Sequence, residues 1–467
     1  MRQLILAAAL AFAGPALATD GALDDTFGTD AQFPGYGFYV NPNGAPNNSL
    51  DTPGAVVPAQ DGKLWLVGRM KSPGAYRLSL YRVQANGYPD VDFGDLGLRT
   101  VVGPCTDFSV GDATRDAQDR LLVAINNCAD FIVYRFLPNG DLDANFAAGG
   151  VLTVPFDQGG DNQDLSQKIA TTPDGDIVVA GTVTTAATTR LGIARYTSAG
   201  LPKPGFGANG KVQLTFEWSV PEIFGVNGLH VAADGRIVVA GAITESAQAV
   251  SDKKQFVVRL LAGGGMDPSF GNVSPGLSKI NLKAPLGVTQ SPWTYASLLE
   301  PDGSVIQVGK VQSNQVGSDG DVFLLRWRPD GQLDTGIGPN GVRQYALDFA
   351  GPNPADPADN WEAARTIARQ SNGDYVIAAS CYAGEFPAVG VLRLKRDFSV
   401  DTRFGNGGKI RHLVEIGTNG DHGLHADRIA LQPGRIVLAG SATTGFNGRV
   451  QTMVGLQHDS LFADTFD

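Results

Sequence analysis

Short apolar runs separated by turn residues fill most of the chain. One set of four runs covers residues 168–172, 177–181, 191–196 and 211–216, each rich in Val, Ile, Leu or aromatic side chains. Pro-Asp-Gly separates the first two runs, which is typical of a hairpin turn because glycine adopts positive φ and Asp bonds its own backbone. The runs are too short for helices, and no segment keeps a helical period. The pattern predicts an all-β protein.

The hairpin signal recurs seven times at a spacing of roughly sixty residues, which indicates a repeat architecture. The clearest copies read P-D-G-D-I-V-V-A-G at 173–181 and A-D-G-R-I-V-V-A-G at 233–241. Looser copies occupy 60–68, 118–125, 301–309, 372–380 and 433–440. Because four meandering antiparallel strands make one propeller blade, we expect a single seven-bladed β-propeller over residues 19–458.

A second signature, Leu-Asp-x-x-Phe-Gly or a close variant, links the third and fourth runs of each repeat. Its copies occupy 23–28, 89–94, 142–147, 202–207, 266–271, 333–338 and 400–405. The copy at 202–207 has Lys203 in place of the acid. We expect the Asp to form an Asx turn that satisfies loop amides and the Phe to anchor the loop in the core. A repeated calcium ligand is a weaker alternative, because calcium needs six or more oxygens and each copy offers one recurring carboxylate.

The two signatures are offset at the ends of the chain. The first Leu-Asp-x-x-Phe-Gly element precedes the first hairpin, and the strand expected after it, Gly37 to Val40, has no blade of its own. The last repeat supplies only three strands, near 424–431, 435–443 and 450–457. We therefore expect the N-terminal strand to complete the C-terminal blade, which would remove free sheet edges.

The paired signatures resemble the delta-60 repeat family, bacterial repeats described as β-propeller blades. The resemblance covers nearly the whole chain after residue 18 and rests on two motifs that alternate. It implies an exported, often surface-associated protein of unassigned biochemical role, and it brings no catalytic residues. The chain departs from the repeat pattern at Lys203, at Gln118–Asp119 and at Ile337–Gly338.

Residues 1–18 have the pattern of a secretory signal peptide. Arg2 is followed by an apolar stretch and by the small-x-small site Ala16–Ala18, after which we expect cleavage. A membrane anchor is the alternative, but a span needs about twenty apolar residues and Gly14-Pro15 interrupts this stretch. We expect an exported protein that is periplasmic, cell-surface or extracellular, with no transmembrane segment.

The C-terminal tail, residues 459–467, has two interpretations. It resembles a short acidic-aromatic ending found on some exported bacterial proteins, which would indicate sorting or surface processing. It also resembles a truncated copy of the repeat's own D-T-F-G at Asp25 to Gly28.

Charge and composition narrow the range of partners. The formal net charge is −11 and basic clusters are absent, which disfavours nucleic acid and anionic lipid. The 60 glycines fall at regular turn positions, so they indicate tight turns rather than disorder. We expect a monomer without a cofactor, whose partner is an unidentified ligand or an envelope or extracellular component.

The chain has three cysteines. An exported protein can form disulfides, and an odd number of cysteines leaves at least one free thiol. Cys105 and Cys128 lie at the open end of a predicted hairpin whose turn is near Gln118. Simple pairing leaves them a few residues out of register, which a β-bulge would absorb and a flat ladder would not. Their disulfide is therefore a possibility that the residues leave open. Cys381 follows a buried-looking strand and is expected to be an inert apolar side chain.

Irregular segments between blades are the expected place for a ligand site, because loops carry sites on a rigid scaffold. Three acidic segments each precede an innermost strand, so their carboxylates should share one rim of the channel. The candidate ligand-binding residues are Asp157, Asp161, Asp164, Asp348, Asp356, Asp359, Trp361 and Asp421. Pro-rich, solvated insertions would give the same pattern without any ligand.

His422 and His425 stand beside Asp421 and Asp427 and are candidate ligand-binding residues too. Two histidines with flanking acids can hold a transition metal or supply a base. On a strand, however, side chains three positions apart point to opposite faces, so only a turn would bring them together. We assign no metal site and no catalytic residue from the sequence.

No nucleophile elbow, zinc-protease helix, P-loop or dinucleotide-binding motif is present. The sequence therefore favours an exported, non-enzymatic propeller that acts as a binding or cell-envelope interaction module. The alternative is a secreted propeller hydrolase or lyase that acts on a carbohydrate or lactone through rim carboxylates, because acids from separate blades can meet in space.

Overall fold

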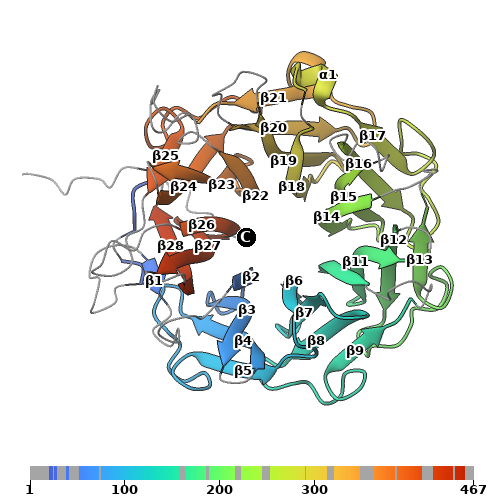
Figure 1. Cartoon of the computed structure of the whole chain (residues 1–467), viewed down its shortest axis with the longest axis vertical. Coiled ribbons are helices and arrows are strands. Elements are labelled where there is room, and N and C mark those ends of the chain that lie inside the picture. The colour runs from blue at the N-terminus through green and yellow to red at the C-terminus, as the bar shows by residue number, and fades with distance from the viewer. Residues whose placement is uncertain are drawn as a thin grey trace, which may run out of the picture.

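The computed structural model describes residues 20–24, 26–28, 38–40, 52–72, 75–156, 164–185, 189–215, 222–244, 253–289, 291–312, 320–347, 362–383, 386–412, 424–444 and 448–457. The predicted signal peptide, residues 1–18, and the tail, residues 459–467, lie outside these ranges. Seven four-stranded antiparallel sheets are arranged around a central axis (Figure 1). The predicted all-β, seven-bladed propeller is confirmed.

Each blade is a meander in which strand order follows chain order. Blade 1 contains β2 (Thr52–Pro58), β3 (Leu64–Ser72), β4 (Ala75–Val83) and β5 (Leu98–Val102). Blade 2 contains β6 (Ser109–Arg115), β7 (Leu121–Asn126), β8 (Phe131–Phe136) and β9 (Val151–Val154). Blade 3 contains β10 (Leu165–Thr171), β11 (Ile177–Thr184), β12 (Thr189–Tyr196) and β13 (Lys211–Leu214). Blade 4 contains β14 (Glu222–Val231), β15 (Ile237–Thr244), β16 (Lys253–Leu260) and β17 (Leu277–Ile280).

The remaining blades follow the same plan except for the last strand. Blade 5 contains β18 (Trp293–Leu299), β19 (Val305–Gln312), β20 (Gly320–Trp327) and β21 (Val342–Tyr345). Blade 6 contains β22 (Ala363–Arg369), β23 (Tyr375–Ala383), β24 (Phe386–Leu394) and β25 (Lys409–His412). Blade 7 contains β26 (Leu424–Gln432), β27 (Arg435–Thr444), β28 (Gly448–Gln457) and the N-terminal strand β1 (Phe38–Val40).

Helical structure is limited to two short pieces in the described residues, α1 (Lys283–Leu286) and a 3₁₀ turn, η1 (Pro339–Gly341). In the part of the chain that is described, no helix has the length and apolar character needed to cross a membrane.

The ends of the chain meet at blade 7. β1 pairs with β28, with Phe38 opposite Val454. The first Leu-Asp-x-x-Phe-Gly element adds a bridge between Leu23 and Leu456, and Phe27 is buried in the cluster that joins blades 7 and 1. The offset between the two signatures therefore reflects a C-terminal blade whose outer strand, β1, and first Leu-Asp-x-x-Phe-Gly element come from the N-terminal part of the chain.

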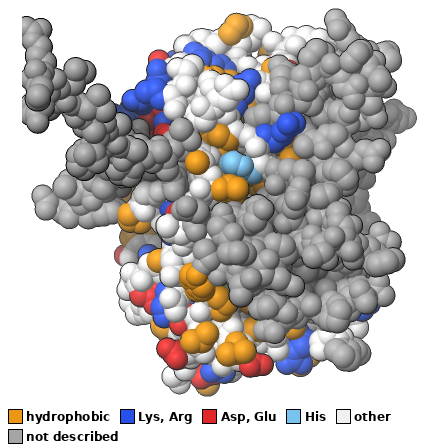
Figure 2. All heavy atoms as spheres, turned by 90° about the vertical axis from the view of Figure 1, so that its left-hand side faces the viewer, with side chains coloured by type: hydrophobic (Ala, Val, Ile, Leu, Met, Phe, Trp, Pro, Cys, Tyr) orange, Lys and Arg blue, Asp and Glu red, His pale blue; other side chains and the backbone are white. Residues whose placement is uncertain are grey.

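Seven buried apolar clusters hold the ring together, one at each interface between neighbouring blades. Alternate side chains of each middle strand face the blade before and the blade after, so both faces of these strands are apolar. On the described surface seen in Figure 2, acidic and basic side chains are interspersed and hydrophobic ones form small, separate patches.

Each innermost strand carries a β-bulge opposite the end of the hairpin signature. In blade 3 the register shifts between Ser166 and Lys168, and Ser166 pairs with Gly181, the last residue of P-D-G-D-I-V-V-A-G. A Cβ at Gly181 would overlap the carbonyl oxygen of Leu165. The bulge brings backbone against this position, which is why the signature ends in glycine.

The recurring Asp of the second signature pairs with an arginine near the end of the third strand. Arg135 contacts Asp143, Arg259 contacts Asp267 and Arg393 contacts Asp401, each at 2.8 Å. Blades 1 and 5 repeat the pair with Arg82–Asp90 and Arg326–Asp334. In blade 7 the arginine comes from the second strand instead: Arg435, at the start of β27, pairs with Asp24.

The predicted Asx turn is also present. The amide of Ser269 donates to Asp267 Oδ1 at 2.9 Å, and the ring of Phe270 lies under the Arg259 guanidinium at 4.5 Å. Burial opposes ionisation, but the hydrogen bonds of Ser269 and the charge of Arg259 hold the pKa of Asp267 at about 2. The acid is therefore a structural ion-pair partner.

The same arginines join neighbouring blades. Arg195 Nη1 donates to the Ala262 carbonyl of blade 4 at 2.8 Å, and Arg259 Nη1 donates to the Pro329 carbonyl of blade 5 at 2.7 Å. Arg82 reaches Pro138 in the same way, and Arg135 reaches Ser198. Each pair thus fixes a loop within its own blade and the position of the next blade.

Lys203 is part of a charge exchange. Blade 3 has Asp176 at the hairpin position where blade 4 has Arg236, and Asp176 contacts both Arg195 and Lys203 at 2.8 Å. In blade 4, Arg236 contacts Asp267. The substitution at Lys203 is therefore compensated within the blade.

Cys105 and Cys128 form a disulfide with a Cα–Cα distance of 6.0 Å. The adjoining strands β6 and β7 shift register between Val110 and Asp112, so a bulge lies at this end of the hairpin. Cys381 is buried within β23, where burial raises the pKa of its thiol to about 12.

We expect Gly181→Ala to lower the free energy of unfolding by about 2 kcal/mol, because the added methyl group overlaps backbone at the bulge. Gly265→Ala is the control, since a Cβ there meets nothing within 4 Å. Urea unfolding of both variants measures the difference. Equal midpoints for the two variants would contradict the role of the bulge.

We expect Lys203→Asp to destabilise the protein by about 1 kcal/mol, because it places a second carboxylate beside Asp176. Adding Asp176→Arg recreates the arrangement of blade 4 and should restore most of the loss. A double-mutant cycle by urea unfolding tests this, and additive effects of the two substitutions would refute the charge exchange.

Candidate functional site

The seven innermost strands, β2, β6, β10, β14, β18, β22 and β26, surround the axis (Figure 1). Their bulges fall at equivalent positions, and there the repeat pattern of the chain breaks down. The bulged residues are Gly54, Gly111, Gln167, Asn227, Tyr295, Arg365 and Asp427. The residues that follow them are Ala55, Asp112, Lys168, Gly228, Ala296, Thr366 and Arg428. These positions share neither size nor charge.

Side chains at the bulges connect neighbouring blades. Arg428 Nε donates to the Gly54 carbonyl at 2.6 Å, which links blades 7 and 1. The Val226 amide donates to Gln167 Oε1 at 2.9 Å, which links blades 4 and 3. The bulges thus make a second set of inter-blade contacts around the axis.

Two further contacts continue this set. His230 Nε2 and Ser297 Oγ are 2.9 Å apart, which links blades 4 and 5. The Arg365 guanidinium lies 4.5 Å from the centre of the Tyr295 ring, which links blades 6 and 5. Groups in the inner strands are therefore held in fixed positions by the neighbouring blades.

Charges from non-adjacent blades meet near Lys168. Burial lowers the pKa of Lys168, the carboxylate of Asp112 in blade 2 opposes this, and the charge of Arg428 in blade 7 adds to it. Lys168 in β10 and Arg428 in β26 each directly follow the bulge of an innermost strand, so both lie beside the axis.

His230 belongs to the same group of residues. Burial and the charge of Lys168 lower its pKa to about 4. The imidazole is therefore neutral near pH 7 and shares one hydrogen bond with Ser297. We call Asp112, Lys168, Asn227, His230, Ser297 and Arg428 the axial cluster.

Some polar groups of the axial cluster have no partner among the described residues. The Lys168 ammonium makes neither a hydrogen bond nor an ion pair there. Asn227 Oδ1 is buried and accepts no hydrogen bond. Arg428 uses Nε for Gly54 and Nη1 for the Asp427 carbonyl, which leaves Nη2 available. The cluster therefore presents donors and an acceptor that the described fold does not use.

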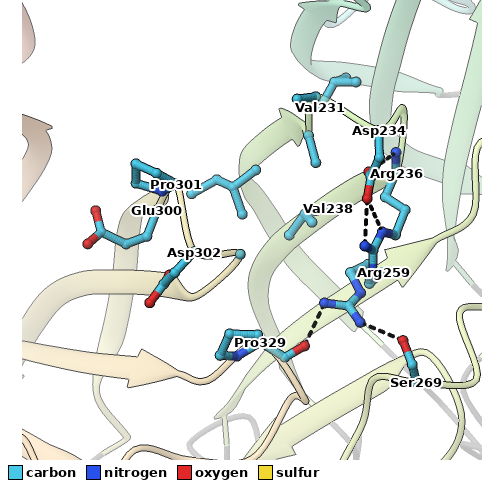
Figure 3. A pocket seen from close by; sticks show the side chains of 14 residues that line it. Val231, Asp234, Arg236, Val238, Arg259, Ser269, Glu300, Pro301, Asp302 and Pro329 are labelled. Atoms are coloured by element: carbon cyan, nitrogen blue, oxygen red, sulfur yellow. Dashed lines mark hydrogen bonds and ion pairs between the residues drawn. The ribbon is translucent and has the colours of Figure 1, made fainter.

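A separate cleft of about 660 Å³ lies between the hairpin turns of blades 4 and 5 (Figure 3). Its charged walls are paired internally: Arg236 contacts Asp234, and Arg259 donates to Pro329 and Ser269. Glu300 lines the cleft, but Figure 3 shows its side chain directed away from the two arginines. This cleft uses its polar groups for the ion pairs of the repeat.

Most of the acidic candidates lie outside the described residues. This applies to Asp157, Asp161, Asp348, Asp356, Asp359, Trp361, Asp421 and His422. His425 is in β26, but its side chain is not described. The ligand role of these nine residues stays a prediction.

Asp164 is described, and it is buried. Its carboxylate accepts hydrogen bonds from the amides of Phe156 at 3.3 Å and Thr184 at 3.1 Å. The residue thus supports the start of β10. Among the described residues, no group of three or more His, Cys, Asp or Glu side chains has a geometry suited to a metal ion.

Sequence reasoning missed the axial cluster. Lys168 begins an apolar run and Asp112 lies in a mixed segment, residues 109–115, so neither stands out in the sequence. The partner of His230 is one blade away, 67 residues along the chain. An alignment of the seven innermost runs would have shown that the bulge positions do not repeat. The axial cluster also differs in the sign of its net charge from the acidic segments predicted at the rim, because it has two cations and one carboxylate.

Comparisons with known proteins agree with the fold. The family described as a domain of unknown function (DUF5122) β-propeller matches residues 172–206 and 232–270, in blades 3 and 4. Those two segments are therefore similar to repeats of a β-propeller family. No curated protein matches the chain.

Among solved structures, the polysaccharide lyase Uly1 is similar with a TM-score of 0.50 and 11% identity, over 95% of this chain and 98% of that one. A protein from Lactobacillus plantarum has a TM-score of 0.44 and 15% identity, over 77% and 88% of the two chains. Sqt1 from Chaetomium thermophilum has a TM-score of 0.44 and 12% identity, over 89% and 100%. At these identities the similarity concerns the fold alone.

We expect His230 to titrate near pH 4 and to make the fold less stable as the pH falls from about 6.5 to 4. In that window the unfolded chain binds a proton that the folded chain does not. NMR titration of His230 and urea midpoints across the window measure both effects. His230→Gln should flatten the midpoint curve there, and Lys168→Met should raise the pKa of His230. A His230 pKa that Lys168→Met leaves unchanged would contradict the proximity of the two residues.

Proposed function

We propose that this protein is an exported binding module whose ligand contacts the axial cluster. One observation carries the proposal: the repeat pattern breaks at the bulges, where polar groups from several blades face one axis. Residues that repeat are accounted for by turns, ion pairs and packing. Binding of a ligand would explain why these positions differ from blade to blade and why they keep polar atoms without a hydrogen-bond partner.

Preorganisation supports this role. The residues beside the axis are fixed by hydrogen bonds to neighbouring blades, as Arg428 is to Gly54 and Gln167 is to Val226. A ligand would meet groups whose conformational entropy is already reduced, which favours affinity. The closed ring provides the rigid scaffold.

Export and a delta-60 type of repeat form part of the same proposal. The N-terminal residues 1–18 have the composition of a signal peptide. The disulfide between Cys105 and Cys128 suits an oxidising compartment. The paired signatures favour the delta-60 assignment, and the matching β-propeller family is compatible with it.

One contact favours the enzymatic alternative, a secreted hydrolase or lyase. The neutral His230 lies within hydrogen-bond distance of the Ser297 hydroxyl, the arrangement of a base and a nucleophile. A pKa of about 4 makes His230 a weak base, and no carboxylate among the described residues orients its second nitrogen. Binding is therefore the better-supported function.

We expect a ligand of this site to raise the melting temperature of the mature protein, because binding to the folded state alone stabilises it by about 2.7 kcal/mol at a hundredfold excess over Kd. A thermal-shift screen of glycans and small metabolites measures this. Asn227→Ala should reduce the shift, and Asn406→Ala, on an exposed loop, should not.

Two outcomes would count against the binding proposal. A shift that both variants retain would place the ligand away from the axis. Turnover of an ester or lactone that Ser297→Ala abolishes would establish the enzymatic alternative.

A further inference from the structure

The sign of the charge at the axis differs from that of the whole chain. The protein has a formal net charge of −11. The axial cluster has two cations, Lys168 and Arg428, and one carboxylate, Asp112, while His230 is neutral near pH 7. Two cations beside the axis with one counter-charge leave a positive centre that an anion would stabilise.

The unused hydrogen-bonding groups add a second requirement. Lys168 Nζ and Arg428 Nη2 are donors, and both are cationic. Asn227 Oδ1 is an acceptor, buried and without a donor among the described residues. Lys168 and Asn227 lie beside Gln167 and Val226, which are hydrogen-bonded to each other at 2.9 Å. Lys168 and Asn227 are therefore close together, and Arg428 follows the equivalent bulge in blade 7.

Together these groups define the ligand chemistry. We propose that the axial cluster binds a hydroxylated carboxylate, such as a sugar acid, and this inference rests on the proposed binding function. Lys168 and Arg428 hold the carboxylate, and Asn227 accepts a hydrogen bond from a ligand hydroxyl. Charge-assisted bonds of this kind are about twice as strong as neutral ones, so the carboxylate supplies most of the affinity.

Other ligand classes satisfy only part of the cluster. A neutral sugar leaves the two cations without a counter-charge. Sulfate offers no donor to Asn227 Oδ1, which would stay buried and unpaired at a cost. A metal cation would be repelled by Lys168 and Arg428. A hydroxylated carboxylate meets both requirements at once.

Titration calorimetry of the mature protein with sodium D-glucuronate, D-glucose and sodium sulfate tests this inference. We expect glucuronate to bind more tightly than either of the others, and more weakly as salt is added. Lys168→Met should weaken glucuronate binding roughly ten- to hundredfold. Lys168→Arg, which keeps the charge, should retain most of it. Lys395→Met, on an exposed turn, is the matched control and should have no effect.

Several results would overturn the inference. Recognition of the carboxylate would be excluded if glucose bound as tightly as glucuronate. It would also be excluded if Lys168→Met left the affinity for glucuronate unchanged. Sulfate that binds as tightly as glucuronate would exclude recognition of the hydroxyl group. Absence of glucuronate binding would also refute it. The proposed function fails separately, if no ligand of any class loses affinity in Asn227→Ala.

Discussion

The ring depends most on the arginine that closes the third strand of a blade. Its guanidinium pairs with the Asp of the second signature, packs on the Phe of that signature and donates to a carbonyl of the next blade, as Arg259 does with Asp267, Phe270 and Pro329. Removing one partner of such a partly buried pair would leave a charge uncompensated, which is costly. In blade 7, Arg435 at the start of the second strand makes the same set of contacts, with the N-terminal Asp24, with Phe27 and with the Ala85 carbonyl of blade 1, so this type of contact also joins the ends of the chain.

Local rules account for what the sequence predicts well. Turn chemistry and a constant period identify the hairpins, the strand count and the offset at the ends, because each depends on a few adjacent residues. The residue that pairs with an Asp from another strand is less visible in the sequence. Lys203 departs from the repeat pattern, and only the fold places it beside Asp176. Apart from the bulge considered beside Cys105 and Cys128, the bulges were also missed, since they form between strands and their trace in the sequence is a glycine such as Gly181.

The axial cluster was beyond sequence reasoning for a geometric reason. Its members come from blades 2, 3, 4, 5 and 7, and only ring closure brings them to one axis. The acidic candidates were found because they are contiguous in sequence, whereas Lys168 and Arg428 are 260 positions apart and their proximity depends on the whole fold. Repeating residues build the ring, and the residues that break the pattern give its axis a distinct chemistry.

The central claim is that a ligand binds at the axis, on residues that do not repeat. A crystal structure of the mature protein grown with D-glucuronate tests it most directly. The account predicts density for the ligand beside Lys168 and Arg428, with a ligand hydroxyl within hydrogen-bond distance of Asn227. Ligand density in the cleft between blades 4 and 5, with none at the axis, would contradict it.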